Sequence, residues 1–226
     1  MRDALILVIG TGPAGLAAAV ALAERGATVQ AVGPRPLASA ARDTRTAALF
    51  GPSVTFMRSI GAFDRLEGAS EPITGIRLID DTGRLLRAPD ALFKARDVGR
   101  QAFGLNCPNA AIVEALVSRA GTLPTLSLIN DSVSAIEPRA EHVAVILASG
   151  RTLEARLVVG ADGRGSPSRI AAGISATTWS HPQTAIVTSF AHSRPHGGIS
   201  TEFHRASGPF TTVPLKGDRS SLVWVE

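Results

Sequence analysis

Near its start the 226-residue chain has an apolar run that lacks the polar alternation of a half-exposed strand. Residues 4–9 are all apolar, a pattern typical of a central parallel strand buried on both faces. A glycine-containing turn follows, and the small residues of 14–25 predict a helix. Residues 27–32 predict a second parallel strand, which the chain enters through Gly26 as a helix C-cap. These elements are the strand, turn, helix and strand of an α/β fold.

The following residues change between helical and β-type periodicity. Residues 34–41 are rich in Pro, Ala and Ser and predict a loop. Helical periodicity appears at residues 52–60 and 110–120. β-type alternation at residues 73–86, with turn residues at 80–83, predicts an antiparallel hairpin that interrupts the βαβ order.

The second half of the chain is mainly β-like. A third parallel strand is predicted at residues 126–130. A meander of three strands follows, at residues 132–136, 142–147 and 152–159. Four more strands are predicted after Gly173, at residues 184–190, 198–203, 210–214 and 221–225. No helix follows the last of them, so we expect the polypeptide to be incomplete.

The turn between the first strand and the first helix reads Gly10-Thr11-Gly12-Pro13-Ala14-Gly15. The first two glycines allow a tight turn and a close approach of a ligand, and the third lets the helix pack against the strand. The free N–H groups and the positive dipole end of the helix form a seat for a pyrophosphate. The motif predicts dinucleotide binding, and the alternative is a glycine turn in an ordinary α/β protein.

The end of the second predicted strand departs from the usual dinucleotide-binding pattern. An acidic residue usually stands there and binds the hydroxyls of the adenosine ribose, whereas this chain has Gly33-Pro34. The departure weakens the contact with adenosine, and it gives no support to NAD as the ligand of the glycine turn.

Three other polar residues are candidates for contacts with a ligand. Arg42 and Arg45 precede the helix predicted at residues 52–60, where they could meet a phosphate or adenine, or could form a solvated pair with Asp43. Asn109 precedes the helix predicted at residues 110–120, and N-capping alone would explain it.

Asp162 follows a predicted strand in the segment Gly160-Ala161-Asp162-Gly163. A carboxylate on a glycine-flanked turn after a buried strand can accept hydrogen bonds from ligand hydroxyls, such as those of a ribityl chain. By itself an Asp-Gly pair indicates only a turn. Because it follows the glycine turn and the meander, we interpret it as a second part of the same site.

Charge, cysteine content, hydropathy and histidine spacing argue against a nucleic-acid-binding, disulfide-linked, membrane-spanning or metal-binding protein. The formal net charge of +4 is spread without a Lys/Arg block, so nucleic acid is not favoured as a partner. Cys107 is the only cysteine, which excludes an intramolecular disulfide and indicates a reducing compartment. It predicts a buried apolar role, with a catalytic thiol as the alternative. No apolar run reaches the roughly 20 residues of a bilayer span. Four histidines match no tight metal-ligand motif, so no metal is expected: His181, His192, His196 and His204.

Taken together, these motifs resemble the class A FAD-dependent aromatic monooxygenases, and more narrowly the ubiquinone-biosynthesis hydroxylases of the UbiH/Coq6 type. The resemblance covers the whole chain. It rests on the segments 10–15, 43–49, 109–112 and 160–166. Landmarks of the substrate domain in that subfamily are matched at residues 183–187, 192, 208–209, 214–215 and 221–224.

The resemblance implies an α/β fold with a Rossmann-like FAD-binding domain of the glutathione-reductase type and an inserted β-meander. It also implies part of an α+β substrate domain with a mainly antiparallel sheet. The FAD-binding domain would comprise residues 1–72 and 104–173. Residues 73–103 would form a substrate-domain hairpin, and residues 174–226 a substrate-domain sheet truncated at its C-terminal end.

FAD is the cofactor that the resemblance implies, with NAD(P)H, or alternatively an electron-transfer partner, as the electron donor. The implied cofactor contacts are Gly10, Gly12, Pro13, Ala14, Gly15, Arg45, Asn109, Asp162 and Gly163. O₂ would be captured as a flavin C4a-hydroperoxide, and the ring of a polyprenylated phenol would be hydroxylated in ubiquinone biosynthesis. The cofactor carries this chemistry, so no catalytic side chain is assigned.

A second FAD motif of the type Gly-Asp-Ala-Ala-His, expected downstream in this family, is absent from the sequence. We therefore expect the chain to be too short to be active alone. The alternatives are another FAD-dependent oxidoreductase, of the prenyl reductase or halogenase type, and an inactive flavin-binding fragment. We expect a cytoplasmic protein, with peripheral attachment to the inner membrane or to a ubiquinone-biosynthesis complex left open.

Overall fold

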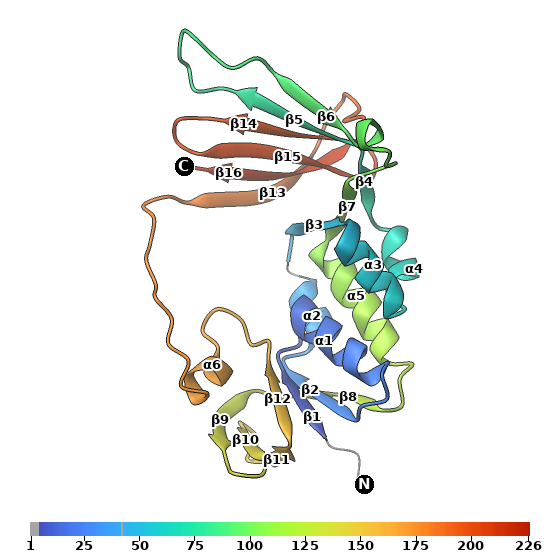
Figure 1. The fold of residues 1–226 in the computed structure, drawn as a ribbon, viewed down its shortest axis with the longest axis vertical. Coiled ribbons are helices and arrows are strands. Elements are labelled where there is room, and N and C mark those ends of the chain that lie inside the picture. Colours follow the sequence, from blue (N-terminus) through green and yellow to red (C-terminus); the bar gives the residue numbers. More distant parts are fainter. Residues whose placement is uncertain (1–4, 42) are drawn as a thin grey trace. The chain divides into compact units, whose positions relative to one another are not determined.

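The computed structural model describes residues 5–41 and 43–226, which group into two compact units. The first unit combines residues 5–41 with Ile60–Ala62 and Ile112–Trp179. The second combines Asp43–Ser59, Phe63–Ala111 and Ser180–Glu226. Each unit is thus built from segments that are distant in the sequence, as the mixed colours within each show (Figure 1). The domain boundaries expected from the sequence stay a prediction.

A four-stranded parallel sheet forms the centre of the first unit. Its strands lie in the order β12-β1-β2-β8. They are β1 (Ile6–Ile9), β2 (Val29–Gly33), β8 (Leu126–Asn130) and β12 (Leu157–Gly160). Ile9 pairs with Val32 on one side and with Gly160 on the other. The three predicted parallel strands are confirmed, and their carboxyl ends share one edge of the sheet.

Both faces of β1 are covered. On one face Val8 packs with Ala19 and Ala23 of α1 (Pro13–Ala23). On the other face Leu7 and Ile9 pack against the meander. Leu7, Val8 and Ile9 are at most 3% exposed. Burial on both faces explains why the sequence shows an unbroken apolar run here instead of alternation.

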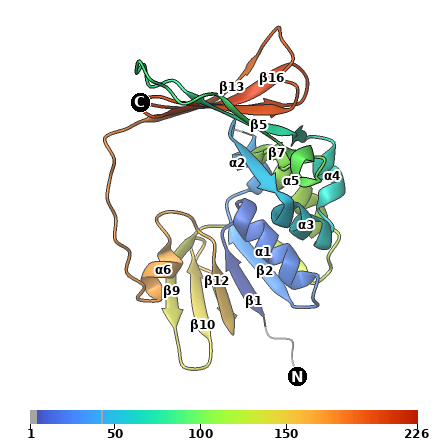
Figure 2. The ribbon, with the colours of Figure 1, turned by 45° about the horizontal axis from the view of Figure 1, so that its top comes forward.

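The predicted antiparallel meander is present and lies beside β12 (Figure 2). Its strands are β9 (Val133–Pro138), β10 (Val143–Leu147) and β11 (Thr152–Ala155). The single strand predicted at residues 152–159 is wrong, because Arg156 separates β11 of the meander from β12 of the parallel sheet. As an edge strand β12 is also only half-buried, and Leu157 is 51% exposed.

Two short helices and one long helix complete this part of the chain. The loop predicted at residues 34–41 contains the helix α2 (Pro36–Ala40), since proline at a first helical position favours a helix start. The predicted helix at residues 110–120 is confirmed as α5 (Asn109–Ala120), with Ile112, Val113 and Leu116 buried. Helix α6 (Pro167–Ala171) follows the Asp162 segment.

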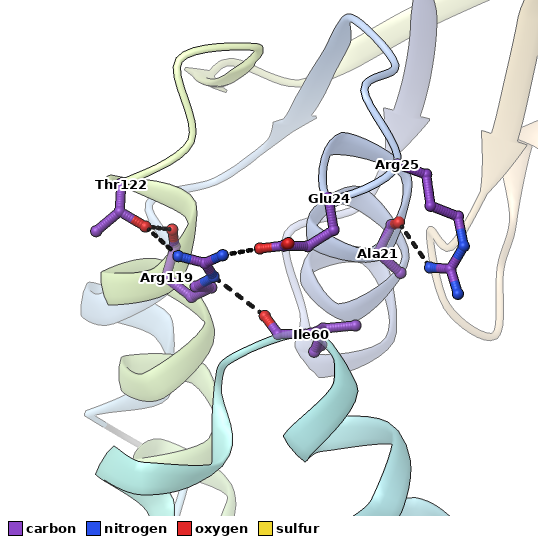
Figure 3. Close-up of polar contacts among 6 residues, drawn as sticks. All are labelled: Ala21, Glu24, Arg25, Ile60, Arg119 and Thr122. Carbon is purple, nitrogen blue, oxygen red and sulfur yellow. Dashed lines mark hydrogen bonds and ion pairs between the residues drawn. The ribbon is translucent and has the colours of Figure 1, made fainter.

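A single arginine joins three segments of the first unit (Figure 3). Arg119, in the last turn of α5, donates from Nε to the carbonyl oxygen of Ile60 at 3.1 Å. Its Nη1 donates to Oγ1 of Thr122 at 2.8 Å, and its Nη2 pairs with the carboxylate of Glu24, the C-cap residue of α1. Arg119 therefore connects the ends of α1 and α5 to the inserted segment Ile60–Ala62.

A six-stranded sheet forms most of the second unit, in the order β13-β16-β15-β14-β5-β6. Its strands are β5 (Gly75–Asp80), β6 (Ala91–Lys94), β13 (Ala185–Ala191), β14 (Ile199–His204), β15 (Pro209–Leu215) and β16 (Arg219–Val225). All neighbours are antiparallel except β14 and β5, which are parallel. The four strands predicted near the end of the chain are confirmed.

A small three-stranded sheet and short helices accompany this large sheet. The small sheet contains β3 (Thr46–Phe50), β4 (Glu71–Ile73) and β7 (Gly104–Pro108). The helices are α3 (Gly51–Ser59), as predicted, α4 (Phe63–Glu67) and the 3₁₀ helix η1 (Ala95–Val98). The buried Asn106 of β7 donates from Nδ2 to the carbonyl oxygen of Pro214 at 2.8 Å, which links the two sheets.

The predicted hairpin at residues 73–86 is only partly correct. Its first strand is β5, but the antiparallel partner is β6, so the connection runs from residue 81 to 90. Asp80 explains the longer loop, because its carboxylate accepts hydrogen bonds from Thr82 and from the N–H of Ala88, eight residues on. Leu85 and Leu86 consequently lie in the loop and not on a strand.

Within the described part of the chain, no helix has the length and apolar character required to cross a membrane.

Candidate functional site

The glycine turn connects β1 to α1 at the carboxyl edge of the parallel sheet. Two of its glycines are required by close packing inside the protein. A Cβ atom at Gly10, where φ is +117°, would lie 2.2 Å from the carbonyl oxygen of Ala161. A Cβ atom at Gly15 would lie 1.9 Å from the carbonyl oxygen of Gly10. Both contacts are with backbone atoms, so neither position accepts a side chain without movement of the chain.

Gly12 differs from these two glycines. Its φ of −76° suits any residue, and a Cβ atom there would meet no atom within 4 Å. Gly12 is the N-cap of α1, and no described side chain caps the helix at that end. Pro13 occupies the first turn, which contains no acidic residue. The space in front of this helix end is therefore open, and the first N–H groups of a helix lack intrahelical acceptors.

This geometry suits an anion. The N–H groups of Ala14 and Gly15 lie in the first turn of an eleven-residue helix, before the hydrogen bond from Leu16 N–H to the Gly12 carbonyl. The positive end of the helix dipole adds to their attraction for negative charge. The residues present thus fit a diphosphate group, with the open position at Gly12 as the point of approach.

Thr11 has a role in the turn that the sequence motif did not reveal. Its side chain is buried, and its Oγ1 donates to the carbonyl oxygen of Pro34 at 2.7 Å. A Cβ atom at Gly33 would lie 2.4 Å from this Oγ1 and 2.9 Å from the N atom of Thr11. An acidic side chain at position 33 would therefore collide with Thr11.

The Asp162 segment meets the glycine turn, as the sequence predicted. Gly160 pairs with Ile9 in neighbouring parallel strands, so both loops leave the same edge of the sheet. The position of a Cβ atom at Gly10 lies 3.1 Å from the N atom of Asp162. The proximity of the two loops is a feature of the first unit alone, and the roles of Asp162 and Gly163 toward a cofactor stay predictions.

The carboxylate of Asp162 is held by its own loop. Its Oδ1 accepts a hydrogen bond from Oγ of Ser166 at 2.5 Å, and its Oδ2 accepts one from N–H of Ser168 at 2.8 Å. Burial acts to raise the pKa of Asp162, but these hydrogen bonds outweigh it and lower the pKa. The side chain is therefore a fixed anion that organises the start of α6, and each oxygen keeps a lone pair for a further donor.

Arg45 and Asn109 form a cluster with Asp43 in the second unit. Arg45 donates from Nε and Nη2 to the two oxygens of Asp43, each at 2.8 Å, and Nδ2 of Asn109 donates to Asp43 at 3.0 Å. The hydrogen bond from Arg45 and that from Asn109 hold the pKa of Asp43 well below its usual range, although burial opposes them. The Arg–Asp pair is thus present, while contacts of Arg45 and Asn109 with flavin stay predictions. Arg42 lies outside the described residues.

Cys107 is fully buried, as predicted. Its Sγ lies 3.0 Å from Oγ of Ser70. Burial raises the pKa of the thiol, so it is protonated at neutral pH. Among the described residues, no group of three or more His, Cys, Asp and Glu side chains is arranged to hold a metal ion.

Comparisons with known proteins identify the family of the chain. Residues 3–225 match the model of a family described as FAD binding domain. The chain is 36% identical to ubiquinone hydroxylase UbiL of Rhodospirillum rubrum over 98% of its length and 51% of that protein. It is 25% identical to 3-demethoxyubiquinol 3-hydroxylase of Escherichia coli, over 98% of its length and 57% of that protein. The chain therefore spans about half the length of the curated relatives it matches.

Solved structures share the fold. PqsL, a probable FAD-dependent monooxygenase from Pseudomonas aeruginosa, matches with a TM-score of 0.81 at 20% identity over 98% of this chain and 60% of that one. HpxO of Klebsiella pneumoniae, solved with FAD and uric acid, matches with a TM-score of 0.79 at 18% identity over 99% of this chain and 56% of that one. The predicted fold class and the resemblance are confirmed, and the chain belongs to the FAD binding domain family that includes class A flavin monooxygenases.

Proposed function

We propose that the chain is part of an FAD-dependent monooxygenase that hydroxylates the aromatic ring of a polyprenylated phenol in ubiquinone biosynthesis. The names of two relatives, a ubiquinone hydroxylase and a demethoxyubiquinol hydroxylase, support this substrate class. The family match supports FAD as the cofactor. NAD(P)H as the electron donor follows from the resemblance of the motifs and is part of the proposal.

One observation carries the cofactor assignment. Gly12 is the one glycine of the turn at which a Cβ atom would meet no atom within 4 Å, and it stands at the uncapped N-terminus of α1. The protein's own packing requires glycine at Gly10 and Gly15, but it does not require glycine at Gly12. A ligand that approaches the backbone explains the glycine at position 12.

The proposed contacts follow from this geometry. The turn, with Gly10, Gly12, Pro13, Ala14 and Gly15, would hold the diphosphate of FAD through its N–H groups and the helix dipole. FAD supplies the redox chemistry when it is bound. The contribution of the chain is to bind and orient the cofactor and to exclude water around it.

Residues outside the turn complete the proposed set. Asp162 and Gly163 would serve the diphosphate and ribityl region, where Asp162 offers fixed acceptor oxygens to hydroxyl groups. The resemblance of the motifs adds Arg45 and Asn109 to the proposed cofactor contacts. The bonds of Arg45 to Asp43 use its Nε and Nη2 atoms and leave Nη1 for an anionic group.

The experiment is to replace Gly12 by aspartate and to compare FAD binding with stability. An aspartate is a better N-cap than glycine and complements the helix dipole, so Gly12→Asp should not lower the urea midpoint. Its side chain would occupy the diphosphate position with a like charge. We expect FAD affinity to fall by about tenfold or more in a flavin fluorescence titration, which corresponds to a loss of about 1.4 kcal/mol or more.

Gly68→Asp is the matched control, because a Cβ atom at Gly68 also meets no atom within 4 Å. It adds the same charge away from the turn and should leave FAD affinity unchanged. Unchanged FAD affinity in Gly12→Asp would refute the proposed diphosphate site. For the reaction itself, NAD(P)H oxidation is measured with and without a prenylated phenol, and ¹⁸O₂ incorporation into the phenol identifies hydroxylation.

A further inference from the structure

The connection between β5 and β6 carries an unusual pair of apolar side chains. Leu85 is 100% exposed and Leu86 is 89% exposed, which are the largest exposed fractions among the large hydrophobic residues of the described chain. The loop projects away from the other strands of its sheet (Figure 1). Single exposed leucines are common on protein surfaces, whereas two adjacent ones at a projecting tip form an exposed apolar contact surface.

This loop is held in shape by its base. Oδ1 of Asp80 accepts hydrogen bonds from N–H and Oγ1 of Thr82, at 3.1 and 2.6 Å, and its Oδ2 accepts one from N–H of Ala88 at 2.9 Å. One carboxylate thus ties together the two ends of the segment 82–88. Next to it, Nε of Arg205 donates to Asp81 at 2.9 Å and fixes the loop to the end of β14.

Two arginines flank the leucines, in the order Arg84-Leu85-Leu86-Arg87. Three acidic residues lie nearer the base: Asp80 and Asp81, which are hydrogen-bonded, and the exposed Asp90, directly before β6. The tip therefore presents two apolar side chains between two cations. Both arginines are exposed, so their guanidinium groups can reach a surface that the leucines enter.

We propose that residues 84–87 are a membrane-contact loop for anionic lipid surfaces. Leu85 and Leu86 enter the boundary between headgroups and acyl chains, and Arg84 and Arg87 bind the lipid phosphates. The charge pattern fits a negative surface, and arginine is suited to phosphate geometry. Two leucines are too few for a standard protein interface, which takes about 20–30 residues from each side. The inference does not depend on FAD or on the proposed reaction.

The physical chemistry predicts a reversible attachment. Burial of one leucine side chain is worth about tenfold in affinity or more, and one arginine near an anionic surface about fivefold. Together they give an attachment weaker than that of a transmembrane helix, in the range of peripheral binding.

The test is sedimentation of the purified protein with vesicles. One set contains phosphatidylcholine alone, and the other contains phosphatidylcholine with about one-third phosphatidylglycerol. We expect binding to the anionic vesicles. L85S/L86S should weaken it by about a hundredfold or more, about tenfold for each leucine, and R84Q/R87Q should reduce it to the level seen with phosphatidylcholine alone.

Matched controls remove comparable groups elsewhere. Val98→Ser removes another exposed apolar side chain, since Val98 is 64% exposed, and R100Q/R151Q removes two exposed charges. Neither control should change vesicle binding. The Leu85→Trp variant provides a direct readout, because its emission should shift to shorter wavelength when anionic vesicles are added.

Three results would overturn the proposal. The first is that the wild-type protein does not sediment with either vesicle. The second is that the leucine variant and the Val98 control bind anionic vesicles equally well. The third is that L85S/L86S changes the oligomeric state in gel filtration without lipid, which would make the loop a contact between copies of the chain.

Discussion

The arginine that joins α1, α5 and the segment Ile60–Ala62 gives a sharp test of how the first unit is held together. We predict that Arg119→Met destabilises this unit strongly. Methionine keeps the apolar stem of the side chain and removes the guanidinium group. The variant therefore leaves the carbonyl oxygen of the fully buried Ile60 and the carboxylate of Glu24 without their donor.

The magnitude follows from the burial of each partner. The side chains of Arg119 and Glu24 are 28% and 24% exposed, so their ion pair is worth about 1 kcal/mol, near the upper end for surface pairs. A hydrogen bond from a charged donor to a buried carbonyl is worth about 1.5–3 kcal/mol. Thr122 is exposed, and its bond adds little. The expected loss is about 2–4 kcal/mol, or about 4–16 °C in Tm for a chain of this size.

Arg25→Met is the matched control, because Arg25 stands one residue after Glu24 and is exposed (Figure 3). Its Nη1 donates only to the carbonyl oxygen of Ala21 in its own helix. This variant should change the free energy of unfolding by less than about 0.5 kcal/mol. Both are compared with wild type by urea unfolding, followed by circular dichroism.

A double-mutant cycle with Glu24→Gln separates the ion pair from the bond to Ile60. We expect a coupling energy of about 1 kcal/mol between Arg119 and Glu24. In the Glu24→Gln background, Arg119→Met should still cause the larger part of its loss of stability, because the bond to Ile60 is lost there as well. Equal stability of Arg119→Met and Arg25→Met would show that the three-way contact contributes nothing, and the reasoning from burial would be wrong.

Three further predictions concern the site and the cysteine. Gly33→Asp should lower the free energy of unfolding by more than about 2 kcal/mol in urea, because its Cβ would lie 2.4 Å from Oγ1 of Thr11. Asp162→Asn should cost about 1 kcal/mol at neutral pH. The native pKa of Asp162 is lowered, so its contribution is present above the ordinary carboxyl pKa and is lost as the pH falls below it, where the difference in urea stability should shrink. Cys107 should react with a thiol reagent only after unfolding, because burial raises its pKa and blocks access.

The local sequence pattern was sufficient to predict the elements whose buried positions follow a regular pattern within one segment. The run at Leu7, Val8 and Ile9 predicted β1 because each of these residues is buried, on one face or the other. The helix α5 was predicted because Ile112, Val113 and Leu116 recur with helical spacing on its buried side. In both cases the signal lies within one short segment.

The errors arose where the structure depends on contacts between distant residues. The pattern of residues 152–159 cannot reveal that Arg156 marks a change of sheet, since both halves are extended. The hairpin loop was predicted too short because the bond from Ala88 N–H to Asp80 spans eight residues. Asn106 gave no signal either, because its partner Pro214 is 108 residues away.

The glycine turn shows why a sequence motif alone does not establish a binding site. A Cβ atom at Gly10 or Gly15 would collide with backbone atoms, so these two glycines would be needed for the fold even in a protein that binds nothing. Gly12 has no such requirement, since its φ is ordinary and its surroundings are open. The motif alone cannot separate these causes, because all three positions carry the same residue. The case for a bound dinucleotide therefore depends on Gly12, where a substitution can separate FAD binding from stability.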